Sequence, residues 1–265
     1  MSELWFAAPA LALALSLFAL APLGAQVLRR GVVFIDLAVA QAAAAAALGI
    51  AAFVDHPSWW VTQASSAAGA LTAAAVVAGL ARRWPAQREA LIGLVYVACA
   101  CAALLAARTD PHGRERMAEL LAADVLWASW PQVALLGACA LGVAVASRWL
   151  ARDALFFPLF ALVASITVPV LGLFLVFATL IAPALWRQAG AGWVPVLAGG
   201  LLAMGLGLGA SWGLDAPSGA CVALGLASFG LLSVWRAKEA RSAQSVHHPW
   251  CYSQVSNLGN NRMRW

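Results

Sequence analysis

The sequence has few charged residues. Only 10% of its 265 residues are Asp, Glu, Lys or Arg, whereas 63% are hydrophobic. A soluble domain of this size exposes a large charged surface, and there are too few charged side chains here to build one. Hydrophobic runs long enough for a helix to cross a bilayer recur along nearly the whole chain. The composition therefore predicts an all-α fold, a polytopic transmembrane helical bundle.

Lysine is almost absent. Lys238 is the only one, so the net charge of +5 comes from arginine. In a membrane protein such an excess indicates orientation rather than nucleic-acid binding, and we expect no nucleic-acid partner. The phosphate-binding pattern G-x-x-x-x-G-K-[ST] does not occur in the sequence. The chain is therefore expected to be a transport subunit rather than an enzyme, with energy supplied by another subunit or by an ion gradient.

Residues that bind transition metals are also scarce. The four histidines all lie in loops or in the tail: His56, His112, His247 and His248. A metal ion between the two loop histidines stays a weak possibility, because no cysteine or carboxylate cluster accompanies them. Cysteines inside hydrophobic runs are expected to be small buried residues: Cys99, Cys101, Cys139 and Cys221. We expect no permanently bound cofactor.

Arginines between the hydrophobic runs predict a topology through the positive-inside rule. The expected spans are Leu4 to Gly24, Gly31 to Val54, Val61 to Ala81, Ala90 to Ala107, Gln132 to Leu150, Ala154 to Val170, Gly172 to Leu185, Val194 to Trp212 and Ala220 to Trp235. This gives eight or nine crossings, with the N-terminus outside and the C-terminus inside. Arg108 to Arg116 is expected as an outer loop, and Met117 to Trp130 as a half-buried amphipathic helix beside it.

One hydrophobic segment, Val168 to Arg187, is interrupted by Pro169, Gly172 and Pro183. Proline removes a backbone donor, and such interruptions are tolerated in lipid where neighbouring helices or a cavity satisfy the backbone. Two short helices meeting near Gly172 also keep the later basic cluster on the inner side. We expect this broken-helix hairpin to be the working part of a transporter.

Polar residues at membrane depth are costly, so each is a candidate for the translocation path. The candidates are Asp36, Gln41, Asp124 and Thr167. A salt bridge to the neighbouring arginines explains Asp36 equally well, and a solvated helix face explains Asp124. Hydrogen bonding between helices is the alternative for Gln41 and Thr167.

Two further segments are interpreted from composition. Gly205, Gly209 and Gly213 form a ridge of small residues, which suits close helix packing within the chain or at a dimer seam. Residues 242–265 are polar and aperiodic. They predict a disordered C-terminal tail after a transmembrane domain of residues 1–241.

From about Leu20 to Trp235 the sequence resembles the membrane permease subunits of zinc and manganese ABC importers. The similar segments are Pro22-Leu23-Gly24 with Arg29-Arg30 and Phe34-Ile35-Asp36, Leu121 to Leu126, Gly172 to Arg187, and Gly209-Ala210-Ser211 with Asp215 to Gly219. Each motif is weak alone, but their order along the chain is fairly specific. The resemblance implies a homodimer in the bacterial cytoplasmic (inner) membrane, working with a cytoplasmic ATPase and an extracytoplasmic metal-binding protein.

The resemblance also implies roles for individual residues. Zinc or manganese would be the transported substrate, with Asp36 as a metal ligand on the path. A short helix from Ala184 to Gln188 would contact the ATPase, so Pro183, Trp186 and Arg187 are the expected coupling residues.

The sequence departs from the family pattern at one position that matters for the metal. The family typically has a histidine one turn after the aspartate, where both side chains share a helix face, and Ala40 stands there in this chain. Two alternatives therefore stay open. One is an ATP-independent secondary transporter, and the other is a structural membrane protein whose metal path has decayed.

Overall fold

The computed structural model describes residues 6–51, 54, 57–107, 118, 121 and 123–246. In this part of the chain the fold is all-α, as predicted. The helices are α1 (Ala7–Arg30), α2 (Ile35–Ala51), α3 (Trp59–Arg83), α4 (Arg88–Ala107), α6 (Trp130–Ala146), α7 (Asp153–Leu171), α8 (Leu173–Gln188), α9 (Trp193–Leu214) and α10 (Ser218–Val246). The two short 3₁₀ turns are η1 (Pro85–Gln87) and η2 (Val125–Trp127).

Each predicted span overlaps one of these α-helices. By length and composition, α1, α3, η1 with α4, α7 and α9 suffice to cross a membrane. The other helices are apolar over shorter lengths: α2, α6, α8 and the first part of α10, Ser218–Val234. The direction in which each helix crosses stays a prediction.

The molecular surface matches a lipid environment. Leu94, Leu202 and Leu206 on α4 and α9 are 65–66% exposed, which is unfavourable in water. Tryptophans gather within about one turn of helix ends: Trp59, Trp60, Trp84, Trp127, Trp130, Trp149, Trp186, Trp193 and Trp212. Such belts lie at the two interfaces of a bilayer, because the ring is apolar and its N–H is polar. The chain is therefore a membrane protein.

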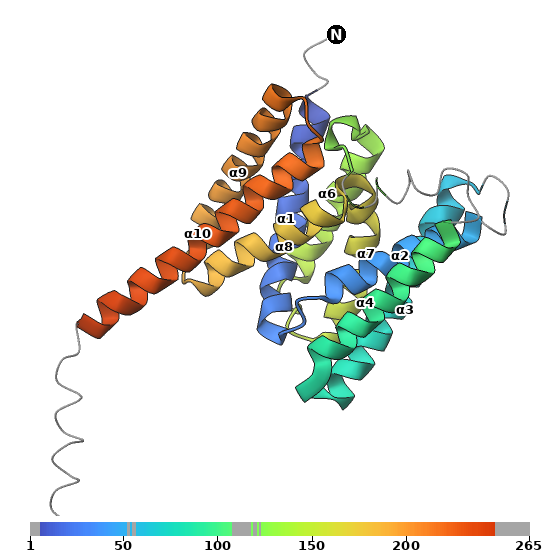
Figure 1. The fold of residues 1–265 in the computed structure, drawn as a ribbon, viewed down its shortest axis with the longest axis horizontal. Coiled ribbons are helices and arrows are strands. Elements are labelled where there is room, and N and C mark those ends of the chain that lie inside the picture. The colour runs from blue at the N-terminus through green and yellow to red at the C-terminus, as the bar shows by residue number, and fades with distance from the viewer. Residues whose placement is uncertain are drawn as a thin grey trace, which may run out of the picture.

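The helices form two flanking groups and a central one (Figure 1). Helix α2 packs against α3 and α4 on one side of the molecule, and α9 packs against α10 on the other. Between them, α1 contacts α6 and α8, while α7 contacts α3. Helices α7 and α8 contribute the most deeply buried side chains.

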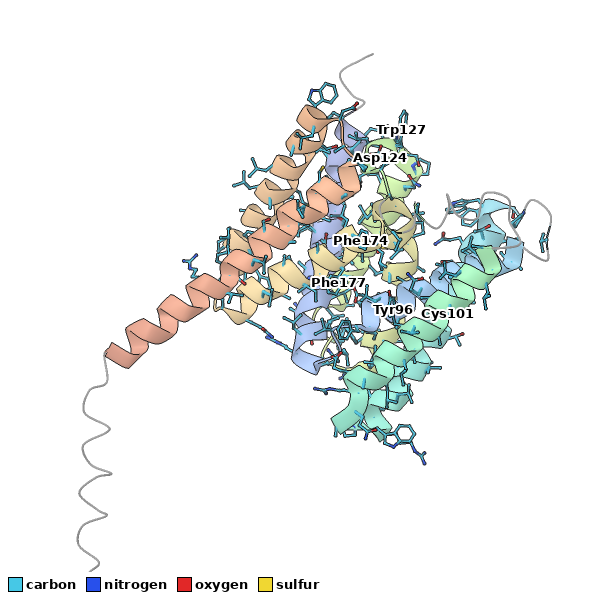
Figure 2. The ribbon with its side chains drawn as sticks, viewed as in Figure 1. Tyr96, Cys101, Asp124, Trp127, Phe174 and Phe177 are labelled. Atoms are coloured by element: carbon cyan, nitrogen blue, oxygen red, sulfur yellow. The ribbon has the colours of Figure 1, made fainter. Side chains whose placement is uncertain are left out.

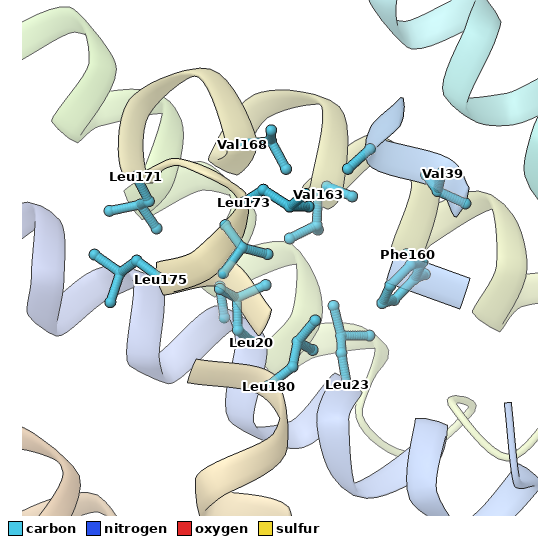
Figure 3. Packing of buried hydrophobic residues seen from close by; sticks show 14 of the residues in the cluster. Leu20, Leu23, Val39, Phe160, Val163, Val168, Leu171, Leu173, Leu175 and Leu180 are labelled. Carbon is cyan, nitrogen blue, oxygen red and sulfur yellow. The ribbon is translucent and has the colours of Figure 1, made fainter. Parts of the chain in front are cut away.

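Leucine and phenylalanine side chains fill the space between α1, α7 and α8 (Figure 3). Leu20, Leu23 and Leu180 are at most 1% exposed. The backbones of α1 and α8 also touch, since a Cβ atom on Gly24 would overlap the carbonyl group of Leu180. Glycine at this position therefore sets the distance between the two helices.

The predicted break between α7 and α8 is present. Helix α7 ends at Leu171 and α8 begins at Leu173, with only Gly172 between them. Gly172 has φ +78°, a conformation that other residues rarely adopt. Pro169 and Pro183, in contrast, lie inside helices without ending them. The residues predicted as a short coupling helix, Ala184 to Gln188, are the end of α8 rather than a separate helix.

The helix predicted from Met117 to Trp130 is wrong over residues 123–129. That stretch is irregular except for η2, and most of 117–122 lies outside the described residues. The predicted outer loop and all four histidines also lie outside them. Helix α10 continues to Val246, past the predicted tail boundary at Ser242, and residues 247–265 are not described.

The glycine ridge on α9 does not pack against the residues that the structure describes. A Cβ atom on Gly205, Gly209 or Gly213 would meet nothing within 4 Å. The close contact between α9 and α10 is made instead by Gly207, whose added Cβ would overlap the backbone of Val222. The ridge thus leaves an open surface on the molecule.

One hollow on the lipid-facing surface is entirely apolar. It has a volume of about 560 Å³ and lies between α8 and α10, where Phe174 and Phe177 line it (Figure 2). Its walls supply no polar group that would orient a polar substrate. The polar candidates lie elsewhere.

Candidate functional site

The turn between α1 and α2 places Asp36 in the interior. Helix α1 ends at Gly31, whose left-handed conformation (φ +59°) lets its N–H bond to the carbonyl of Leu28. A side chain there would also meet the guanidinium group of Arg88. The chain then enters α2 at Ile35, and Asp36 in its first turn is only 2% exposed.

Both carboxylate oxygens of Asp36 lack a hydrogen-bond partner. Among the described residues, the other buried side-chain atoms in this condition are Gln41 Oε1 and Glu89 Oε2. Buried polar atoms are normally bonded, and an exception calls for a water molecule, an ion or a functional role. All of these open acceptors lie on α2 and α4, which pack together.

The structure does not pair Asp36 with the neighbouring arginines. Arg30 Nε lies 3.0 Å from Asp153 Oδ1 and donates to the carbonyls of Leu150 and Ala151. Arg29 makes no hydrogen bond or ion pair with the residues that the structure describes. The salt-bridge explanation of Asp36 is therefore wrong for the described chain.

Glu89 is a site residue that the sequence reasoning missed. Its Oε1 accepts a hydrogen bond of 2.8 Å from the backbone N–H of Val33, which ties the start of α4 to the turn before α2. The two helices thus begin at the same level. Measured from Val33 at about 1.5 Å per residue, Asp36 lies roughly 5 Å and Gln41 roughly 12 Å further along. An acidic residue just after Arg88, at the start of a hydrophobic run, was the available signal.

Thr167 and Asp36 differ in how their oxygens are satisfied. The Thr167 hydroxyl is fully buried and donates to the carbonyl of Val163 in its own helix, at 2.9 Å. This bond lies within α7 rather than between helices. The Thr167 hydroxyl therefore has no free donor to offer a substrate on the translocation path.

Asp124 lies at the opposite end of the molecule from Asp36. Its Oδ1 accepts from the backbone N–H of Leu126, capping η2, and from the Ser218 hydroxyl at 2.5 Å. Figure 2 places Asp124 with Trp127 beside the α9–α10 connection. Asp124 is exposed and paired, and it lies on an irregular segment rather than a helix face.

The two carboxylates cannot share one site, because α7 separates them. The first residue of α7, Asp153, contacts Arg30 near the start of α2, whereas its last residue, Leu171, lies beside Gly219 and Ala123. Helix α7 has 19 residues. A helix of that length spans about 27 Å.

The predicted coupling residues lie at the end of α8 and are held within the chain. Trp186 Nε1 donates to the carbonyl of Phe229 at 2.8 Å, and the two rings stack with centroids 5.2 Å apart. Arg187 donates to the carbonyl of Ala191 and lies 4.7 Å above the ring of Trp193. Arg187 is half-buried rather than exposed, and Pro183 is buried.

The described residues contain no group of three His, Cys, Asp or Glu side chains that would hold a metal ion. Asp36 stands with Gln41 on α2, and Ala40 is 2% exposed where the family pattern has its histidine. Among the described residues, the buried side-chain oxygens open to a cation are therefore those of Asp36, Gln41 and Glu89.

Comparison with known proteins gives one informative likeness. No family model matches the sequence, and a search of curated proteins found no match. Among solved structures, the chain is similar to PsaBC from Streptococcus pneumoniae in complex with Fab. The identity is 19% over 85% of this chain and 89% of that chain, with a TM-score of 0.64.

At 19% sequence identity, the structural similarity establishes the fold of the chain only. It covers 85% of the chain, and so most of the helical bundle described above. The motifs that resemble metal-ion permeases fall within the same bundle. The chain thus has the fold expected from its resemblance to the permease subunits of metal-ion ABC importers, and that resemblance is confirmed at the level of the fold.

Proposed function

We propose that this chain is the membrane permease subunit of an ABC importer that moves zinc or manganese ions into the cytoplasm of a bacterium. ATP would be hydrolysed by a separate cytoplasmic subunit, and an extracytoplasmic protein would deliver the metal. The observation that carries the proposal is the Asp36 carboxylate, 2% exposed and without a partner for either oxygen. An unpaired buried carboxylate is costly, and a passing cation offsets that cost.

The path would follow the open acceptors along α2. Glu89 on α4, and Asp36 and Gln41 on α2, offer oxygen ligands at successive depths from the start of α2. Without a histidine beside Asp36, the cation is held weakly enough to leave again. A weak site suits a conduit, since tight binding would trap the ion.

Coupling to the ATPase would use the end of α8. Its last turn is stiffened by the Trp186–Phe229 stack and by the Arg187–Trp193 contact. A rigid helix end transmits a push from a partner into the bundle, where Gly24 holds α1 against the same helix. The exposed glycine ridge on α9 supports the homodimer, because small residues permit close helix approach.

The test is metal-stimulated ATP hydrolysis by the chain purified with its ATPase in lipid. Asp36→Ala is expected to abolish stimulation by zinc and manganese while the basal rate persists. Asp215→Asn is the matched control. This residue ends α9 in a left-handed conformation that asparagine tolerates, so stimulation is expected to persist. Unchanged stimulation in Asp36→Ala would refute the path assignment.

A secondary transporter is the second candidate, and the break between α7 and α8 favours it, because broken helices also form the substrate sites of such carriers. Co-purification distinguishes the two. An ATPase that co-purifies with the chain supports the importer, and uptake driven by an ion gradient in its absence supports the carrier. If a strain that lacks this chain takes up zinc and manganese at an unchanged rate, both transport functions are excluded. A structural role in the membrane is then the remaining explanation.

A further inference from the structure

A cavity of about 420 Å³ with both polar and apolar walls opens between α1, α8, the start of α9 and the segment after α6, which contributes Ser147 and Leu150. Its lining includes Arg29 and Gln26 from α1, and Arg187 from the end of α8. Trp193, the first residue of α9, stands at its edge and is 38% exposed. The cavity is separate from the open acceptors of α2 and α4, none of which lines it.

The cavity carries positive charge without a matching carboxylate. None of the described residues that line it is acidic. Arg30, the neighbour of Arg29, is neutralised by Asp153, whereas Arg29 has no such partner in the described part of the chain. Arg187 contacts only neutral groups, the carbonyl of Ala191 and the ring of Trp193. Two guanidinium groups facing one cavity repel each other, and a phosphate is the anion whose geometry they match best.

The cavity is also amphipathic along its depth. Pro22 lines it seven residues before Arg29 on the same helix, which is about 10 Å deeper at 1.5 Å per residue. Ala184, three residues before Arg187, lines the same inner part and is 1% exposed. A free anion or an acidic side chain of a partner would use only the charged rim. A phospholipid uses both parts, with its phosphate at the arginines and an acyl chain along the apolar wall.

We propose that this cavity binds an anionic phospholipid through its headgroup phosphate. The tryptophan at the edge places the rim at headgroup depth, where basic pockets between membrane helices hold such lipids. The lipid bridges α1 and the end of α8, and thereby stabilises the contact between them. The site uses none of the open acceptors on α2 and α4, so its binding test does not depend on ion transport, but it shares Arg187 with the proposed contact to the ATPase.

The test is titration of the delipidated full chain in detergent with phosphatidylglycerol, followed by native mass spectrometry and by the midpoint of thermal unfolding. Wild-type protein is expected to retain a bound phosphatidylglycerol and to gain thermal stability, whereas phosphatidylcholine gives neither effect. Arg29→Gln is expected to weaken the binding roughly tenfold, the scale of one lost charge-assisted hydrogen bond. Arg29 is exposed, so we expect this variant to fold like wild type, and circular dichroism checks this.

Arg82→Gln is the matched control. Arg82 is also an exposed arginine in the last turn of its helix, but it does not line the cavity. An equal loss in both variants would mean that binding follows surface charge alone, which overturns the proposal. Equal stabilisation by inorganic phosphate at millimolar concentration would identify a free anion site instead. If no lipid binds and Arg29 cross-links to a co-purified ATPase, the charged rim of the cavity is a contact surface for the ATPase, and the lipid proposal is wrong.

Discussion

Asp36 and Asp124 are two carboxylates with opposite surroundings. Asp124 is exposed, yet its Oδ1 accepts hydrogen bonds from Ser218 and Leu126. Asp36 is buried, yet neither of its oxygens has a partner. A paired carboxylate stabilises the segment that it joins, whereas an unpaired buried one lowers stability and persists where function requires it. The comparison favours a structural role for Asp124 and agrees with the transport role proposed for Asp36.

The largest effect is expected from closing the space beside Asp124. A Cβ atom on Gly219 would overlap the carbonyl oxygen of Ala123. Gly219→Val should therefore separate α10 from the 123–129 segment and cost about 3 kcal/mol or more, the upper range for overpacking. Thermal unfolding in detergent measures this. Gly142→Val, at a position on α6 with open space around it, is the control and should unfold like wild type.

Breaking the Asp124–Ser218 hydrogen bond is expected to have a smaller effect. Asp124→Ala removes a charged acceptor and should cost about 1–3 kcal/mol of unfolding free energy. Because Ser218 is fully buried, Ser218→Ala should cost a similar amount and the double variant little more. Additive losses in this double-mutant cycle would show that the two side chains do not act as a pair. Uptake per folded molecule should stay unchanged in all three variants.

Thr167→Val is expected to have the smallest effect. The hydroxyl bonds only within its own helix, so its loss should change unfolding free energy by less than about 1 kcal/mol. Metal uptake should also persist, since no free donor is removed. A loss of uptake without a loss of folded protein would place Thr167 on the path beside Asp36 and contradict the distinction drawn here.

The sequence predicted the helices well because their signals are local. Hydrophobic runs are bounded by arginine and tryptophan, and Gly172 marks the boundary between α7 and α8 with a conformation that favours glycine. The proline signal was less reliable. Pro183 was expected to separate a short coupling helix, yet α8 runs through it to Gln188, packed against α1 and α10.

The partners of the polar groups could not be predicted, because they depend on contacts between distant segments. Asp124 and Ser218 are 94 positions apart. Glu89 bonds to a backbone group before α2, which no periodicity reveals. The sequence therefore identified Asp36, Gln41, Asp124 and Thr167 as a set. Only the fold separates those with hydrogen-bond partners from those without.

Asp36→Asn provides the most direct test of the central claim. Asparagine keeps the shape of the side chain and removes its charge, so the amount of folded protein and its unfolding temperature should equal or exceed wild type. Uptake of labelled zinc and manganese by whole cells should nevertheless be lost. Retained uptake of both ions would contradict the assignment of Asp36 to the path, and a lower unfolding temperature would contradict the claim that its carboxylate is unpaired.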